Sequence, residues 1–76
     1  MAHAQVNKRR FEFIGGNSGK FWEILVSGNQ VTVTFGRIGT SGQSERKTFP
    51  DAEAAAKHAQ KKIDEKIKKG YVERTT

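Results

Sequence analysis

The chain has 76 residues, enough for one small domain that buries only about 60 % of the surface of its unfolded chain. It has no cysteine, which excludes disulfides and thiolate metal sites, and its two histidines lie far apart without a carboxylate-rich cluster. The 14 lysines and arginines outnumber the 8 acidic residues and give a formal net charge of +6, which favours polyanions or acidic surfaces as partners.

The sequence contains no apolar run near the roughly 20 residues that a membrane span needs, and it begins without an apolar signal core. We therefore expect a cytoplasmic protein that does not contact a membrane. We expect no metal, no cofactor and no small-molecule substrate.

A cationic run, Lys8, Arg9 and Arg10, follows a polar and aperiodic start at residues 1–7. Aromatic residues then alternate with a glutamate in residues 11–14, which predicts a strand. The cationic run has two interpretations that the sequence leaves open. It is either a solvated strand entrance or a set of phosphate contacts.

The strongest predicted strand covers residues 20–27, after a glycine-rich connection at residues 15–19. That connection lacks the lysine and Ser/Thr of a phosphate-binding P-loop, so we interpret it as a hairpin loop. Apolar residues lie on both faces of the strand, which indicates a central position with cover on both sides. Trp22 is expected in the core.

A two-residue turn at residues 28–29 joins this strand to a second alternating run at residues 30–35. The apolar residues of that run, Phe35 included, share one face. Gly36 and Arg37 follow, and glycine at a strand end is typical of a bulge or a close backbone approach. Arg37 is therefore either a solvated hairpin residue or a fixed, exposed cation.

Residues 43–49 form the last predicted strand and carry Arg46 and Lys47. A helix then begins with Asp51 as a plausible N-cap and ends before Gly70. We interpret its lysines mainly as a solvated face that compensates the helix dipole. Its predicted apolar stripe contains Ala52, Ala55, Ala56, Ala59, Ile63 and Ile67.

The order of elements predicts a small α+β domain, with an antiparallel sheet of about four strands and one C-terminal helix packed on a face. After the helix, Tyr71 and Val72 are expected to return to the core, and the residues from Glu73 onward to fray. We expect a single domain at residues 8–73, with flexible residues 1–7 before it and 74–76 after it.

No nucleophile, base or paired-carboxylate set can be assembled from these elements, so we do not expect an enzyme. Residues 36–39 have the G-x-x-G spacing of a KH loop. That loop joins two helices, whereas a strand precedes it here.

The chain resembles the WGR domain family, which is named for a Trp-Gly-Arg signature at the end of a sheet strand. The corresponding stretch is FGRIGTSGQ at residues 35–43, and KFWE at residues 20–23 is similar to the aromatic strand of the family. The resemblance covers about residues 20–73. Its second half rests on Lys47, Phe49, the alanine-rich helix, Lys66, Gly70 and Tyr71.

This resemblance implies a non-catalytic nucleic-acid-binding module. The family occurs in DNA-dependent poly(ADP-ribose) polymerases, in proteins described as molybdate-metabolism regulators and in small bacterial proteins. The resemblance implies DNA ends or breaks as targets. Phe35 stands in place of the tryptophan that packs on a terminal sugar, and Arg37 stands in place of the arginine. Phenylalanine offers a smaller surface and no indole N–H. In the polymerases the arginine helps to hold neighbouring domains together, but these 76 residues contain no polymerase domain for Arg37 to hold.

Two functional hypotheses follow. In the first, the protein binds DNA ends or nicks through phosphate and sugar contacts with little sequence specificity. In the second, it docks an acidic protein partner through the sheet edge or the turn at residues 39–42. The predicted nucleic-acid site consists of Phe35, Gly36, Arg37, Lys8, Arg9, Arg10, Arg46 and Lys47.

Overall fold

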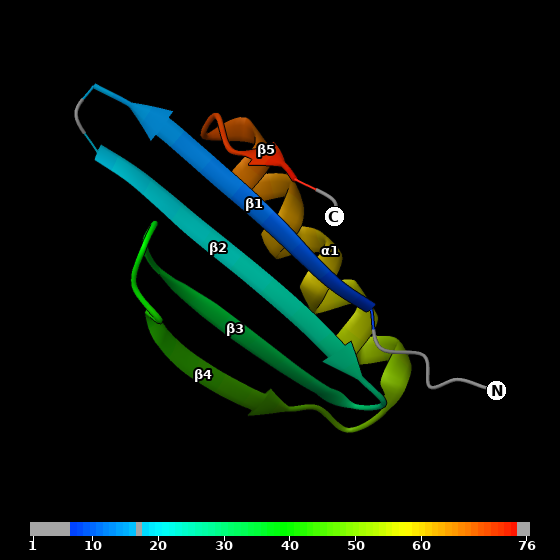
Figure 1. The fold of residues 1–76 in the computed structure, drawn as a ribbon. Coiled ribbons are helices and arrows are strands. Elements are labelled where there is room, and N and C mark those ends of the chain that lie inside the picture. Colours follow the sequence, from blue (N-terminus) through cyan, green and yellow to red (C-terminus); the bar gives the residue numbers. More distant parts are fainter. Residues whose placement is uncertain (1–6, 17, 75–76) are drawn as a thin grey trace, which may run out of the picture.

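The computed structural model describes residues 7–16 and 18–74. It consists of a five-stranded antiparallel sheet and one helix (Figure 1). The sheet order is β4-β3-β2-β1-β5, so β2 is central as predicted. The predicted α+β architecture is therefore confirmed. The elements are β1 (Asn7–Gly15), β2 (Ser18–Ser27), β3 (Gln30–Arg37), β4 (Gln43–Thr48), α1 (Ala52–Lys68) and β5 (Val72–Glu73).

The two-residue turn between β2 and β3 sets the register of the central hairpin. Gly28 takes φ +59°, a conformation that glycine adopts without a steric penalty. Ser27 therefore pairs with Gln30, and the same alternation places Trp22 opposite Phe35. At the far end of the hairpin, this register brings two side chains of like charge, Lys20 and Arg37, opposite each other.

Asp51 caps the N-terminus of α1, as predicted, because its side chain accepts a hydrogen bond of 2.8 Å from the backbone N–H of Ala54. The predicted apolar stripe of the helix is too wide. Its buried residues are only Ala55, Ala59 and Ile63. The helix packs on the sheet along one narrow line with a spacing of four, which leaves Ala52, Ala56 and Ile67 exposed.

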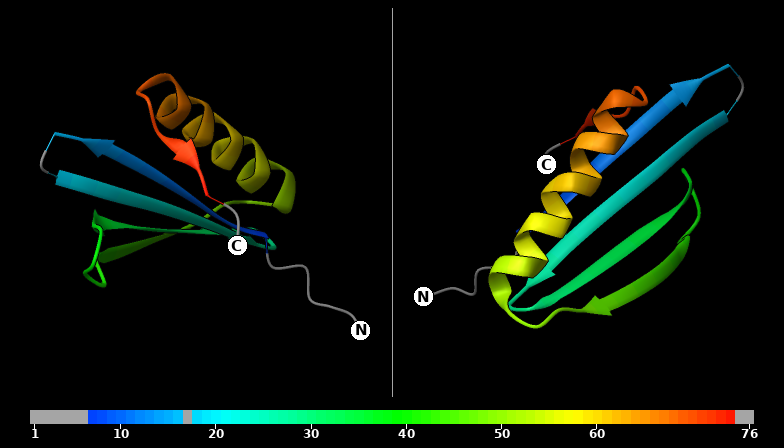
Figure 2. Two further views of the ribbon diagram at one scale, coloured as in Figure 1. Left: turned by 45° about the horizontal axis from the view of Figure 1, so that its top comes forward. Right: turned by 180° about the vertical axis from the view of Figure 1, so that it is seen from behind.

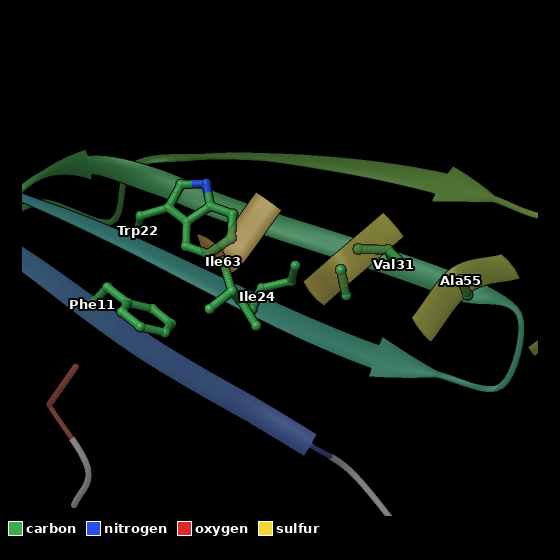
Figure 3. Packing of buried hydrophobic residues seen from close by; sticks show 7 residues of the cluster. Phe11, Trp22, Ile24, Val31, Ala55 and Ile63 are labelled. Carbon is green, nitrogen blue, oxygen red and sulfur yellow. The ribbon is translucent and has the colours of Figure 1, made fainter. Parts of the chain in front are cut away.

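The core lies between α1 and one face of the sheet (Figure 3). Phe11 and Trp22 meet with ring centroids 5.8 Å apart, and Ile24 and Val31 continue the layer beneath the alanines of the helix. The predicted burial of Trp22 is confirmed. Figure 2 shows the helix on this side of the sheet only, and β4, which is exposed along its whole length, extends beyond it.

The predicted cover on the other face of β2 is found only at Phe21, where a loop and the Arg10 side chain supply it rather than a second layer. Phe21 is only 4 % exposed. The Arg10 guanidinium lies 4.6 Å from the centre of its ring, and the backbone of Gly42 closes over the ring edge. Residues 7–16 and 18–74 contain one helix, which lies on the opposite face, and the loop between β3 and β4 closes over Phe21 instead.

The end of the chain differs from expectation. Val72 and Glu73 form β5 against Phe11 and Glu12, so fraying from Glu73 onward is wrong for Glu73 itself. Tyr71 packs on the core, but Val72 is exposed. The Arg9 guanidinium donates two hydrogen bonds of 2.8 Å to the Glu73 carboxylate, and these bonds stabilise the short strand.

The first and third strands are longer than expected. β1 already includes the cationic run, and β3 continues through Gly36 and Arg37. The residues expected to be flexible at 1–6 and 75–76 lie outside the described residues. In the part that is described, no helix is both long and apolar enough to cross a membrane.

Candidate nucleic-acid interface

An open groove of about 700 Å³ lies between α1 and the part of the sheet formed by β3 and β4. It exists because the helix covers the centre of the sheet and leaves the outer strands uncovered (Figure 2). Seven lysines and arginines line it against two glutamates, Glu45 and Glu65. The cationic lining consists of Lys20, Arg37, Arg46, Lys47, Lys62, Lys66 and Lys69.

The floor of the groove is apolar and partly aromatic. Val33 and Phe35 are half-buried and pack on the edge of the core, and both line the groove. Tyr71 lines the same groove and is also half-buried. Phe35 is thus both a core contact and a groove surface, because it lies on the helix face of β3 at a point that α1 does not reach.

Four cations gather at one end of the groove. Lys20 lies directly opposite Arg37 across the β2–β3 pair, and Lys66 and Lys69 approach from α1. Like charges directly opposite each other destabilise a strand pair. Among residues 7–16 and 18–74, none of the four forms an ion pair with a carboxylate. An anion bound at this end would remove the repulsion.

Lys66 is the most enclosed of these cations. Its ammonium nitrogen lies 5.5 Å from the ring centre of Trp22 and 5.2 Å from that of Tyr71, within the range of cation–π attraction. Partial burial lowers the pKa of Lys66, and the nearby charges of Lys69 and Lys62 lower it further. Negative charge in the groove would oppose both effects.

His58 contributes to the groove from the middle of α1. Its ring lies on Phe49 with centroids 4.8 Å apart. Burial lowers the pKa of His58, and the charges of Lys47 and Lys62 lower it further. These surroundings therefore favour the neutral imidazole of His58 in the free protein.

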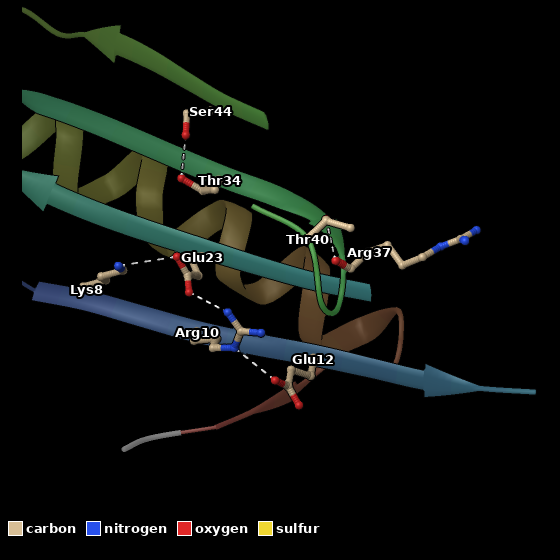
Figure 4. Close-up of polar contacts among 8 residues, drawn as sticks. All are labelled: Lys8, Arg10, Glu12, Glu23, Thr34, Arg37, Thr40 and Ser44. Atoms are coloured by element: carbon tan, nitrogen blue, oxygen red, sulfur yellow. Dashed lines mark hydrogen bonds and ion pairs between the residues drawn. The ribbon is translucent and has the colours of Figure 1, made fainter. Parts of the chain in front are cut away.

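The glycines of the signature stretch permit a close approach of two backbones. A Cβ atom on Gly36 would lie 2.8 Å from the Cα of Gly42, and one on Gly42 would lie 2.4 Å from the carbonyl oxygen of Phe35. Gly42 also has φ +72°. We call this close approach of Gly36 and Gly42 the neck of the loop, and it returns the chain to β4 within a few residues. The Thr40 hydroxyl fixes the turn by donating a hydrogen bond of 2.7 Å to the Arg37 carbonyl oxygen. The Arg37 side chain extends away from the sheet (Figure 4).

The three cations of β1 do not join the groove. Lys8 and Arg10 lie on the sheet face opposite the helix, where both contact Glu23 at 3.5 and 2.6 Å, and Arg10 also contacts Glu12 (Figure 4). Arg9 is held by Glu73, which raises the pKa of its guanidinium. Their charges are therefore largely compensated within the protein.

The remaining predicted residues lie at the groove. Phe35, Gly36 and Arg37 line it, and so does Lys47, which pairs with Val31 on the helix side of the sheet. Arg46 pairs with Thr32 on the opposite side and reaches only the rim.

Four cations of the groove were absent from the predicted site. Lys62, Lys66 and Lys69 recur at spacings of four and three, which places them on one side of a helix, but their sequence context resembled a solvated face. Lys20 was missed although its position opposite Arg37 follows from the two-residue turn. The signal that could have identified Lys20 is the register of the two strands, and not the residue type.

Comparison with known proteins places this geometry in a family. The WGR domain family matches residues 7–76, and the chain belongs to that family. The predicted resemblance is therefore confirmed. A WGR domain is consistent with a nucleic-acid-binding module in general.

Two proteins of one bacterium, Escherichia coli, are similar to this chain. Protein YehF of Escherichia coli is 48 % identical over 65 residues, covering 86 % of this chain and 24 % of that protein. The uncharacterized protein YfeS of the same species is 39 % identical over 66 residues, covering 87 % of this chain and 27 % of YfeS. The chain thus spans about a quarter of each of these relatives. Neither name states an enzymatic activity.

A crystal structure of a Bacteroides fragilis protein has the same fold. Its TM-score to this chain is 0.88 with 49 % sequence identity, and the match covers 91 % of this chain and 20 % of that one.

Proposed function

We propose that this protein binds DNA ends or breaks through the groove, without catalysis and with little sequence specificity. The observation that carries the proposal is the cluster of Lys20, Arg37, Lys66 and Lys69 at one end of the groove. The cluster holds four cations without an acidic partner in the described part of the chain. Such a cluster binds phosphate by charge and reads no base edge.

The position of Phe35 supports an end over the interior of a duplex. Its ring is half-buried at the floor, beside Arg37 at the end of β3. A sugar or base can reach a recessed ring only where the duplex stops or is interrupted. The smaller ring retains an apolar surface for that contact but supplies no N–H.

A titration followed by amide chemical shifts tests this proposal, with a nicked or open-ended duplex and a closed dumbbell of the same sequence. We expect shifts centred on residues 35–43 and on the groove side of α1, with the open-ended DNA alone. Shifts at all lysines with both DNAs would mean non-specific attraction. Absence of shifts with either DNA would contradict the proposal.

A matched pair of variants separates the groove from the general charge of the protein. Arg37→Gln removes a groove cation, whereas Lys8→Gln removes an exposed cation on the opposite face. We expect only Arg37→Gln to weaken binding to the open-ended duplex.

A second candidate function is docking of an acidic protein partner. It is favoured by β4, which is the outermost strand in the sheet order and is exposed throughout. An extended peptide can add to such an edge by main-chain hydrogen bonds. Unchanged DNA binding by a folded Phe35→Ala/Arg37→Ala variant that fails to retain a protein partner would favour this function.

A further inference from the structure

The helix side of the groove carries a row of lysines that contact with a duplex end alone does not use. On the helix side, Lys62, Lys66 and Lys69 form a row that spans about 10 Å along the helix axis, at about 1.5 Å per residue. Lys66 and Lys69 belong to the cluster with Lys20 and Arg37. Lys62 continues the row beyond that cluster, while Lys47 lines the same groove from β4.

From this row we infer that the groove holds unpaired nucleotides at the DNA end, so that an overhang or flap is preferred over a blunt end. The inference rests on the proposed binding of DNA ends. It adds whether the bound nucleotides are paired or unpaired, which the charge cluster at Lys20 and Arg37 leaves open.

The size of the groove supports a single strand. Its volume of about 700 Å³ is in the range of about 300–1,000 Å³ that encloses one drug-sized ligand. A nucleotide is about the size of such a ligand, so the groove has room for a short unpaired segment. A duplex is too wide to enter, because the whole domain measures only 40 × 26 × 20 Å, so paired DNA can only abut the mouth.

The chemistry of the lining also suits a single strand. Proteins that hold unpaired nucleic acid combine a cationic groove along the backbone with aromatic side chains on which bases stack. Here the cations line the walls, and Phe35 and Tyr71 offer partly exposed rings between them. Inside a duplex the base faces are already stacked, so a blunt end offers only the face of its terminal pair, whereas unpaired nucleotides can offer base faces to both rings.

Lys62 is free to serve in this row. Its ion pair with Glu65 is 3.7 Å long, and both side chains are more than two-fifths exposed, which makes the pair weak and easily exchanged for a phosphate.

The outer side of the same helix supplies a matched control. Lys57 and Lys68 lie with Lys61 on a surface away from the groove. A Lys57→Gln/Lys68→Gln variant loses the same charge from the same helix as Lys62→Gln/Lys69→Gln. Lys66 is left unchanged because it packs on Trp22 and its replacement could disturb the fold.

The experiment measures fluorescence anisotropy of the full chain with hairpin duplexes of one sequence that end blunt, in a short 5′ overhang or in a short 3′ overhang. We expect one overhang to bind about tenfold more tightly than the blunt end. The Lys62→Gln/Lys69→Gln variant should lose most of this gain, and the Lys57→Gln/Lys68→Gln variant should keep it.

Stacking is tested separately. Phe35→Leu keeps an apolar floor but removes the ring, and we expect about a fivefold or greater loss for the overhang, since stacking of one base on an aromatic side chain is worth at least about that factor. Unfolding midpoints of all variants verify the fold.

Three results would overturn the inference. Equal affinity for blunt and overhanging ends would remove the preference while leaving the proposed binding of DNA ends in place. An equal loss in the two lysine double variants would assign the gain to overall charge. Failure to bind any open-ended duplex would remove both proposals together.

Discussion

Gly42 is the residue at which backbone geometry most tightly limits the sequence. We expect Gly42→Ala to destabilise the protein by about 2–4 kcal/mol, because alanine at φ +72° is strained and its Cβ would press on the Phe35 carbonyl 2.4 Å away. Gly28→Ala is the control: φ is +59°, but open space surrounds the new atom, so strain of about 1–2 kcal/mol acts alone. Urea unfolding followed by Trp22 fluorescence compares them, and equal losses would contradict the close contact.

His58 gives the stability a dependence on pH that can be isolated. Its pKa is lowered in the folded protein, first by burial and then by Lys47 and Lys62, so the unfolded chain takes up a proton more readily. Stability from this residue is therefore fully present above the unfolded pKa of about 6.5 and is lost as the pH falls through the lower folded value.

We expect His58→Gln to flatten the pH dependence of the unfolding free energy between about pH 7 and 5. His3→Gln, which removes the other of the two histidines, serves as the control. An identical slope in wild type and His58→Gln would show that this histidine does not carry the effect.

At the scale of elements, the side-chain contact of Arg9 with Glu73 holds β5 on β1. A weaker ion pair of Arg74 with Glu12 at 3.6 Å follows it. We expect Glu73→Gln to remove the negative charge and one of the two oxygens that accept from Arg9, and so to loosen the end of the chain from β1. Faster hydrogen exchange at the Arg74 amide, which donates to the Arg10 carbonyl at 2.8 Å, reports this release.

The control for this change is Glu53→Gln, which breaks a fully solvated pair with Lys57 on the helix. Acid should act as Glu73→Gln does. Arg9 lowers the pKa of Glu73 mainly by hydrogen bonding, so the stabilisation is present above the ordinary carboxyl pKa and is lost as the pH falls through the lower folded value. Unchanged exchange at Arg74 in Glu73→Gln would mean that the backbone bonds alone hold β5.

The sequence predicted elements with strong local signals and missed those that depend on distant partners. Alternation and the two-residue turn predicted β2 and β3, and the Asp51 cap predicted the start of α1. β5 was missed because two residues carry no periodicity and pair only through a strand some sixty positions earlier. The groove was half predicted for the same reason: Arg37 lies in a local motif, whereas Lys62 and Lys69 approach it only after the helix packs.

At the scale of the whole molecule, the cations divide into two classes. Those of β1 are compensated by glutamates, and those of the groove are largely not. We expect Arg10→Gln to lower the stability by about 1 kcal/mol, because Glu12 and Glu23 lose a shared partner, and to leave DNA affinity nearly unchanged.

Lys20→Gln should act in the opposite way. It relieves the repulsion with Arg37 and so maintains or raises stability, but it should reduce the slope of log K against log salt by about 0.7–0.9. Salt titrations and unfolding curves of both variants measure the division. If Arg10→Gln and Lys20→Gln changed the unfolding free energy and the DNA affinity equally, the division of the cations into two classes would be contradicted.

The contact between Gly36 and Gly42 has a consequence for how relatives of this chain can diverge. Residues added at the exposed tip, between Gly39 and Ser41, lengthen the loop without moving its neck, and longer loops cost little closure entropy. One residue added after Gly42 instead shifts β4 by a single position and exchanges the faces of Arg46 and Lys47. The tip is thus a natural place for an inserted segment that contacts new ligands, whereas a single insertion beyond Gly42 changes which face of the sheet the side chains of β4 occupy unless a bulge absorbs it.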